Sequence, residues 1–251
     1  MNRFLFLFAI LLSAILSADA STPTMPYEVF AVCEPYLMPN THPLKPILDR
    51  IFGHKRVTLT PRTFTKAGFT VLCKKKRSFI RVARHPLLPG HLVKVYLDSV
   101  LRIKRGKAGW RWLANRCLGA KQLREAIEQE KSKYFQVPRK WLYAIPEAHF
   151  PTNPHKRIKQ PVLLVVEDMQ LVSEKNNLAA WKNNVTKEHL DELYRIIRRA
   201  GGSSYRASNV WLSKNGKFSF IDTEYPEHQG YGAIRSYLSP EMRAYWDKLT
   251  S

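Results

Sequence analysis

An unbroken aliphatic run at residues 162–166 is the feature that most constrains how this chain can fold. The run reads Val-Leu-Leu-Val-Val and is followed by Glu167. A short apolar run of this kind is typical of a buried strand. A strand that is apolar at every position, rather than at alternate positions, is typical of the interior of a sheet. We therefore expect residues 162–167 to form a central strand, whose neighbours come from elsewhere in the sequence.

Four other segments have the composition of strands and are bounded by turn residues. Three of them follow one another, the first two joined by a basic turn at residues 74–77 and the third introduced by Pro89-Gly90. The fourth lies just before the central strand. Helical patterns at residues 110–118 and 120–135 precede it, and Pro138 ends them. We expect these strands at 69–73, 78–83, 92–97 and 141–145.

The C-terminal part of the chain contains one amphipathic helix and one hairpin. Thr186 is a candidate N-cap, and Gly201 closes a helix whose apolar residues recur on one face. Beyond it, two short apolar runs flank Asn215-Gly216, a dipeptide typical of tight β-hairpin turns. We expect a helix followed by a hairpin whose strands lie at 209–212 and 218–222.

The first twenty residues have the pattern of a signal peptide. Arg3 is followed by an apolar run of 13 residues, 4–16, and then by the small residues that signal peptidase prefers. The run is shorter than the ~20 residues needed to span a bilayer. We expect residues 1–20 to be cleaved and the mature protein to be secreted or periplasmic, with a membrane anchor as the alternative if cleavage does not occur. Export permits disulfides. The chain has three cysteines, Cys33, Cys73 and Cys117, which allow at most one internal bridge.

Residues 21–66 are rich in proline. The segment contains seven prolines, a density that disfavours long helices. We expect an extended segment that wraps the domain and carries no recognisable chemistry.

The order of these elements resembles that of the protein kinase and aminoglycoside phosphotransferase superfamily. Asn209 and Asp222 stand 13 residues apart at the open ends of the hairpin, as do the metal-binding Asn and Asp of that family. The resemblance implies an α+β, two-lobed protein-kinase-like fold. Its N-lobe, an antiparallel sheet plus a helix, would span 67–169, and a smaller helical C-lobe with the hairpin would span 170–251. It also implies that Asn209 and Asp222 hold Mg²⁺ or Mn²⁺.

The same resemblance assigns the residues that would bind ATP. Lys94, in the middle of the third strand, matches the lysine that pairs with the nucleotide phosphates, and an interior lysine needs a partner. Counting back from Pro138 gives Glu128 as that partner, with Glu125 one turn away as the alternative. Backbone groups of the hinge would hold the adenine, and the candidates are Val165, Val166, Glu167 and Met169.

The catalytic loop departs from the family pattern. Ser204 stands where the catalytic Asp is expected, and a serine cannot accept the substrate proton at neutral pH. Arg206 matches the loop lysine that contacts the γ-phosphate. Glu224, two residues after Asp222, is a candidate second metal ligand or replacement base, with a solvent-exposed loop acid as the alternative. The basic turn at 74–77 also lacks the glycines of a phosphate-covering loop.

Two interpretations follow. The first is an exported kinase-like protein that binds a nucleotide and a divalent metal, either an atypical phosphotransferase acting on a protein or small molecule, or a pseudokinase. The second is a basic binding module for nucleic acid or anionic membrane surfaces, because 41 Lys and Arg against 20 Asp and Glu give a net charge of +21. The position of Lys94 separates them: burial against a glutamate of the following helix supports the first, and an outward-facing side chain supports the second.

Overall fold

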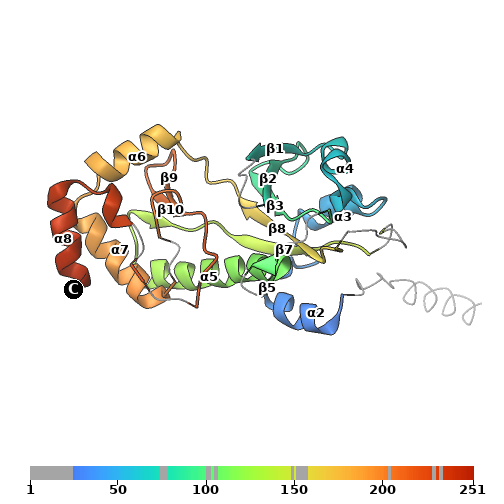
Figure 1. Ribbon diagram of the computed structural model, residues 1–251, viewed down its shortest axis with the longest axis horizontal. Coiled ribbons are helices and arrows are strands. Elements are labelled where there is room, and N and C mark those ends of the chain that lie inside the picture. The colour runs from blue at the N-terminus through green and yellow to red at the C-terminus, as the bar shows by residue number, and fades with distance from the viewer. Residues whose placement is uncertain are drawn as a thin grey trace, which may run out of the picture.

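The computed structural model describes residues 25–73, 79–99, 103–104, 107–147, 150, 158–202, 205–227, 230–231 and 234–251. The fold is mixed α/β. A five-stranded antiparallel sheet lies beside one long helix, α5, and the C-terminal helices gather around a small second sheet (Figure 1). This architecture is compatible with a kinase-like fold. The signal-peptide prediction, the basic turn at 74–77 and Ser204 lie outside the described residues.

The main sheet contains the five strands expected from the sequence. Its order is β1-β2-β3-β8-β7, and every neighbouring pair is antiparallel. The aliphatic run forms β8 and lies between β3 and β7, which confirms its interior position. The strand bounds are β1 Thr70–Cys73, β2 Arg81–Arg84, β3 His91–Val95, β7 Lys140–Ala144 and β8 Val162–Glu167.

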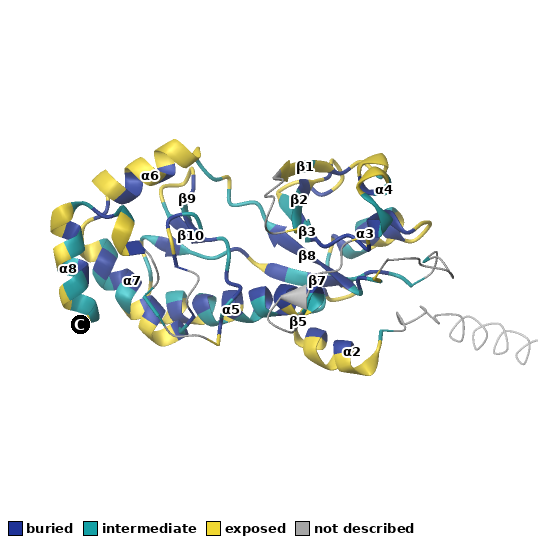
Figure 2. Ribbon diagram, in the orientation of Figure 1, coloured by how far each residue is buried: buried dark blue, intermediate teal, exposed yellow. Residues whose placement is uncertain are grey.

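Both faces of β8 are buried, which explains why its run is apolar at every position. Leu163 and Val165 pack into a core that also contains side chains of α3 and α4. Val162 and Leu164 face the opposite side and pack against α5 and α2. Figure 2 shows buried residues along β8 and on the facing side of α5. The sheet is therefore a middle layer, covered on one side by α3 and α4 and on the other by α5 and α2.

Residues 25–66 form short helices, so the expectation of an extended segment was wrong. Pro35, Pro46 and Pro61 each occupy the first turn of a helix, where the missing N–H has no intrahelical partner to lose. These helices bury apolar side chains against the sheet and belong to its core. They are α2 Tyr27–Cys33, η1 Glu34–Tyr36, α3 Lys45–Phe52, η2 Val57–Leu59 and α4 Pro61–Lys66.

A single helix, α5 Gly109–Gln129, replaces the two helices expected before Pro138. It follows the two-residue strands β4 Ile103–Lys104 and β5 Lys107–Ala108. It ends nine residues before that proline, because the chain turns and continues as the short strand β6 Phe135–Gln136. This early end matters for the site, since a count back from Pro138 no longer identifies the helix residue nearest the sheet.

The C-terminal part packs helices around the predicted hairpin. β10 pairs with β9 in antiparallel and with β6 in parallel orientation, so the hairpin is tied to the chain that follows α5. The helix expected after Thr186 is α7, and Gly201 ends it with a φ of 67°. None of the helices in the described part of the chain combines the length and apolar character needed to cross a bilayer. The elements are α6 Glu174–Asn183, α7 Lys187–Ala200, β9 Val210–Leu212, β10 Phe218–Phe220, η3 Ile234–Tyr237 and α8 Pro240–Thr250.

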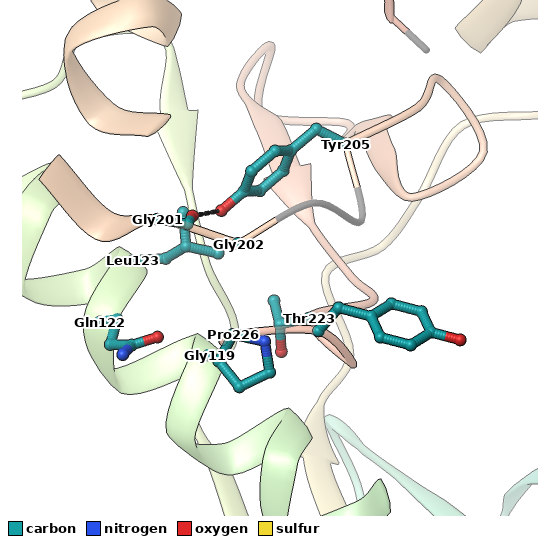
Figure 3. A pocket seen from close by; sticks show the side chains of 9 residues that line it. Gly119, Gln122, Leu123, Gly201, Gly202, Tyr205, Thr223 and Pro226 are labelled. Carbon is teal, nitrogen blue, oxygen red and sulfur yellow. Dashed lines mark hydrogen bonds between the residues drawn. The ribbon is translucent and has the colours of Figure 1, made fainter. Parts of the chain in front are cut away.

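Gly119 allows α5 to approach the segment that follows β10. A Cβ atom at this position would lie 2.5 Å from the carbonyl oxygen of Thr223. Figure 3 shows Gly119 beside the segment that carries Thr223 and Pro226. The close approach brings the buried face of α5 against the residues around Asp222.

We expect Gly119→Ala to destabilise the protein by about 1–3 kcal/mol, because the methyl group would overlap backbone atoms that cannot move independently. Alanine at an unobstructed helical position would instead stabilise by up to about 1 kcal/mol. Urea unfolding of the variant, with the exposed change Gln129→Ala on the same helix as control, checks the sign. A stabilised Gly119→Ala variant would contradict this packing.

Candidate functional site

The hairpin brings Asn209 and Asp222 to its open end. Phe220 on β10 is opposite Val210 on β9, and the Ile221 N–H donates to the carbonyl of Asn209 at 2.8 Å. The two residues thus start and end the paired segment, as the spacing predicted. Their roles depend on the side chains that surround them.

Lys94 reaches this end of the hairpin from the sheet. Val93 and Val95 pack into the core on the α3 and α4 side, so Lys94 lies on the opposite face, toward α5. It is half-buried, and its Nζ donates to the carbonyl of Ile221 at 3.1 Å. The strand lysine therefore points inward and lies next to Asp222, which meets only part of the expectation, because that expectation also placed a helix glutamate beside it.

A second lysine, Lys140 on β7, reaches the same place. Its side chain is buried, and its Nζ donates to Thr223 Oγ1 at 2.9 Å and to the carbonyl of Ile221 at 3.5 Å. Burial, together with the charge of Lys94, holds the pKa of Lys140 well below its usual value. Lys140 could not be identified from the sequence, because a lysine at the first position of a strand is usually solvated.

Arg116 on α5 joins the two carboxylates that follow the hairpin. Its Nε lies 3.1 Å from Asp222 Oδ1, and its Nη2 lies 3.3 Å from Glu224 Oε1. Its Nη1 donates to the carbonyl of Trp112 at 3.2 Å. The Arg116 side chain is 6% exposed, so it forms a buried ion triad with the two acids.

Asp222 is consequently surrounded by cations. Burial alone would raise its pKa, but the charges of Arg116, Lys94 and Lys140 outweigh burial and lower the pKa to about 2. Its side chain is 31% exposed, so one side of the carboxylate remains accessible. We name the set Lys94, Arg116, Lys140, Asp222 and Glu224 the Asp222 cluster.

The lowered pKa of Asp222 predicts an acid-dependent loss of stability. Because its pKa is lower in the folded state than the ordinary 3.8, its ionisation stabilises the fold fully above that value. This contribution, at most about 2 kcal/mol, is lost as the pH falls toward the folded pKa. We expect the stability gap between wild type and Asp222→Asn to narrow by about 1 kcal/mol between about pH 6 and about pH 3. Urea unfolding across that range measures the gap, and a constant gap would argue against the cation environment.

Glu128 and Glu125 do not reach Lys94, so the expected lysine–glutamate pair is not formed. Both lie exposed near the end of α5, where Glu125 is 4.0 Å from Lys121. The count back from Pro138 failed because the helix ends at Gln129 and β6 intervenes. The α5 residue that reaches the Asp222 cluster is Arg116, which reverses the sign of the expected charge.

Glu224 differs from both of its sequence-based interpretations. It is buried at 8% exposure and bound to Arg116, so it is not a solvated loop acid. Its Oε1 lies 3.3 Å from Arg116 Nη2, so Glu224 would have to leave this ion pair to reach a substrate as a base.

The described residues do not fit a divalent metal. Mg²⁺ and Mn²⁺ prefer several oxygen ligands, carboxylates above all. Asp222 and Glu224 are both bonded to Arg116, and the part of the chain that the structure describes contains no group of three or more His, Cys, Asp or Glu side chains able to hold a metal. The cations of the cluster would also repel a further positive charge.

The hinge candidates lie at the end of β8 and just after it. Val165 and Val166 lie within the ladders to β3 and β7, and the Asp168 N–H donates to the carbonyl of Gly90 at 2.8 Å. The Glu167 carboxylate accepts the Arg139 N–H at 2.7 Å. Among the described residues, no hydrogen bond to the backbone of Met169 is found.

The remaining candidate residues lie at the edge of the site. Arg206 is exposed, and its carbonyl accepts the N–H groups of Asn209 and Val210, which shapes the turn before β9. The hollow in Figure 3, between α5 and the Tyr205 hydroxyl that donates to Gly201, has a volume of about 10 Å³. A space of that size holds at most one water molecule. A larger cavity of about 210 Å³ lies at the start of α5, beside α2, and none of the Asp222 cluster lines it.

Comparison with known proteins gives little further guidance. No family model matches the sequence, and no curated protein matches it. A solved structure with partial similarity is the MAP kinase LmaMPK10 from Leishmania major, at 14% identity and a TM-score of 0.31. The similarity covers 64% of this chain and 48% of the kinase, so the chain spans about half of that protein. A likeness this weak does not assign the chain to a family.

Proposed function

We propose that this protein is a kinase-like nucleotide-binding protein that does not transfer phosphate, that is, a pseudokinase. The observation that carries the proposal is the Asp222 cluster, in which Arg116 bonds the carboxylate that a kinase would use for its metal. The division into an N-lobe at 67–169 and a C-lobe at 170–251 belongs to the same proposal.

The support for nucleotide binding comes from two groups of atoms. The amines of Lys94 and Lys140 converge on the carbonyl of Ile221, the residue before Asp222, whose side chain is 31% exposed. Met169, in the segment where a kinase holds adenine, has backbone groups that no other described residue hydrogen-bonds. A bound nucleotide would place its triphosphate near the two lysines and its adenine near the backbone of Met169.

The support for a lack of transfer comes from the acidic groups. Ser204 stands at the position of the catalytic base, and a serine has no useful basicity at neutral pH. Asp222 and Glu224, the other acids of this region, are both bonded to Arg116. Of the candidate acids Asp222 and Glu224, neither is therefore left unengaged to serve as a base or as a metal ligand.

We expect Lys94→Ala to weaken ATP binding by about tenfold or more, because a charge-assisted hydrogen bond contributes about 1.5–3 kcal/mol. Calorimetric titration of ATP into the two proteins measures this change. Lys121→Ala is the matched control, since Lys121 is an exposed lysine of α5 outside the cluster.

Release or transfer of the γ-phosphate is measured in parallel and is expected to stay at the level of a protein-free blank. Turnover that Lys94→Ala abolishes would overturn the pseudokinase assignment. Equal ATP affinity in both lysine variants and wild type would place binding on the basic surface instead of the cluster.

A further inference from the structure

Arg116 is held in the cluster by three separate contacts. Its guanidinium bonds Asp222 Oδ1 at 3.1 Å, Glu224 Oε1 at 3.3 Å and the carbonyl of Trp112 at 3.2 Å. Because the side chain is 6% exposed, a metal ion that took the carboxylates would leave a buried guanidinium without its counter-ions. Breaking a buried ion pair in this way is strongly unfavourable. The arrangement therefore disfavours metal at Asp222.

The charges of the cluster already balance without a metal. Asp222 and Glu224 supply two negative charges, and Arg116 and Lys94 supply two positive ones. Lys140 adds a further amine on the same face of the sheet. A phosphate oxygen approaching Lys94 would thus meet a carboxylate that Arg116 has already neutralised.

We propose that the guanidinium of Arg116 takes the place of the divalent metal, so that the Asp222 cluster binds the phosphate chain of a nucleoside triphosphate in its metal-free form. This inference rests on the proposed nucleotide binding. In this arrangement Lys94 contacts the phosphate oxygens, and the buried Lys140 lies next to Lys94. Arg116 neutralises the charge of Asp222 through their ion pair.

The chemistry of the ligand sets the expected metal dependence. Magnesium-bound ATP carries less negative charge than free ATP, so the amine of Lys94, whose neighbouring carboxylate is already paired with Arg116, attracts the free form more strongly. A magnesium ion that arrives with the nucleotide also has no free carboxylate to coordinate, because both acids are engaged by Arg116. Magnesium should therefore weaken binding, whereas a site of the ordinary kinase type requires it.

The decisive experiment titrates wild-type protein with two probes, ATP and inorganic tripolyphosphate, each in EDTA and in excess Mg²⁺. We expect both probes to bind in EDTA, ATP more tightly because of its adenine, and both to bind several-fold more weakly in Mg²⁺. Tripolyphosphate binding in EDTA with no advantage for ATP would support the metal-free phosphate site but refute the nucleotide function.

The opposite results separate the two proposals. ATP binding that is about tenfold or more tighter in Mg²⁺ would overturn the metal-free site while leaving nucleotide binding intact. A lack of binding of either probe under both conditions would overturn both proposals. All of these arms use wild-type protein, so none depends on the folding of a variant.

A substitution adds a second readout. Arg116→Gln frees one side of Asp222 and Glu224, so we expect Mn²⁺ to improve ATP binding by the variant and to show bound-ion relaxation that wild type lacks. Gln122→Ala, a change on the same helix outside the cluster, should keep the wild-type response. Equal Mn²⁺ binding by wild type and Arg116→Gln would contradict the role given to Arg116.

Discussion

Arg116→Met will lower the free energy of unfolding by about 3–5 kcal/mol, the cost of breaking a buried ion pair from one side. The methionine fills much of the same volume, so the loss arises mainly from charge. Asp222 and Glu224 would be left without the guanidinium that bonds both, and Glu224 is almost fully buried. Urea unfolding of wild type and variant measures the difference.

Two controls separate this electrostatic cost from a simple packing defect. The triple change Arg116→Met, Asp222→Asn and Glu224→Gln removes the three charges together and should restore at least half of the lost stability. Arg195→Met removes an arginine that is 52% exposed and paired with Glu130, and it should cost less than about 1 kcal/mol. A triple variant no more stable than Arg116→Met would show that the loss comes from packing instead of charge.

The strands and the hairpin could be predicted because their signals are local. The aliphatic run of β8 indicates burial on both faces, and Asn215-Gly216 predicts the turn between β9 and β10. The position of Lys94 follows from the alternation of β3, where Val93 and Val95 occupy the core face. These features need no knowledge of distant residues.

The chemistry of the cluster could not be predicted because its contacts are long-range. Arg116 bonds Asp222 across 106 positions, and Lys140 reaches Thr223 across 83. Within α5, Arg116 is one basic residue among several, and nothing local distinguishes the buried one. Gly119 was an available signal, since a glycine inside a helix often marks a close approach, and it lies one turn from Arg116.

The N-terminal helices were mispredicted because the effect of proline on a helix depends on its position. It breaks the interior of a helix, but it is favoured in the first turn. In residues 25–66 several prolines start helices, and the apolar residues between them were treated as part of an extended segment. Because these helices pack in the core, removal of residues 25–66 is expected to affect the stability of the whole fold.

A variant that begins at residue 67 should fail to fold, since residues 25–66 complete one face of the sheet. Leu48, Phe52, Val57 and Phe64 are each at most 2% exposed and pack with β3 and β8. Burying such a side chain contributes about 1.5–3 kcal/mol, so four of them approach the whole stability of a typical domain.

The same deletion would also leave a buried acid unpaired. Arg56 donates to both carboxylate oxygens of Asp98 at 2.9 Å, and Thr58 donates to the same group at 2.8 Å. Asp98 is fully buried at the end of β3, where its carboxylate would lose its counter-ion. We therefore expect no cooperative thermal transition from residues 67–251, and a sharp one from residues 25–251, which retain every described residue. Cooperative unfolding of the shorter variant would show that the sheet and α5 are stable without their N-terminal cover, and the segment would then be a separate addition to the fold.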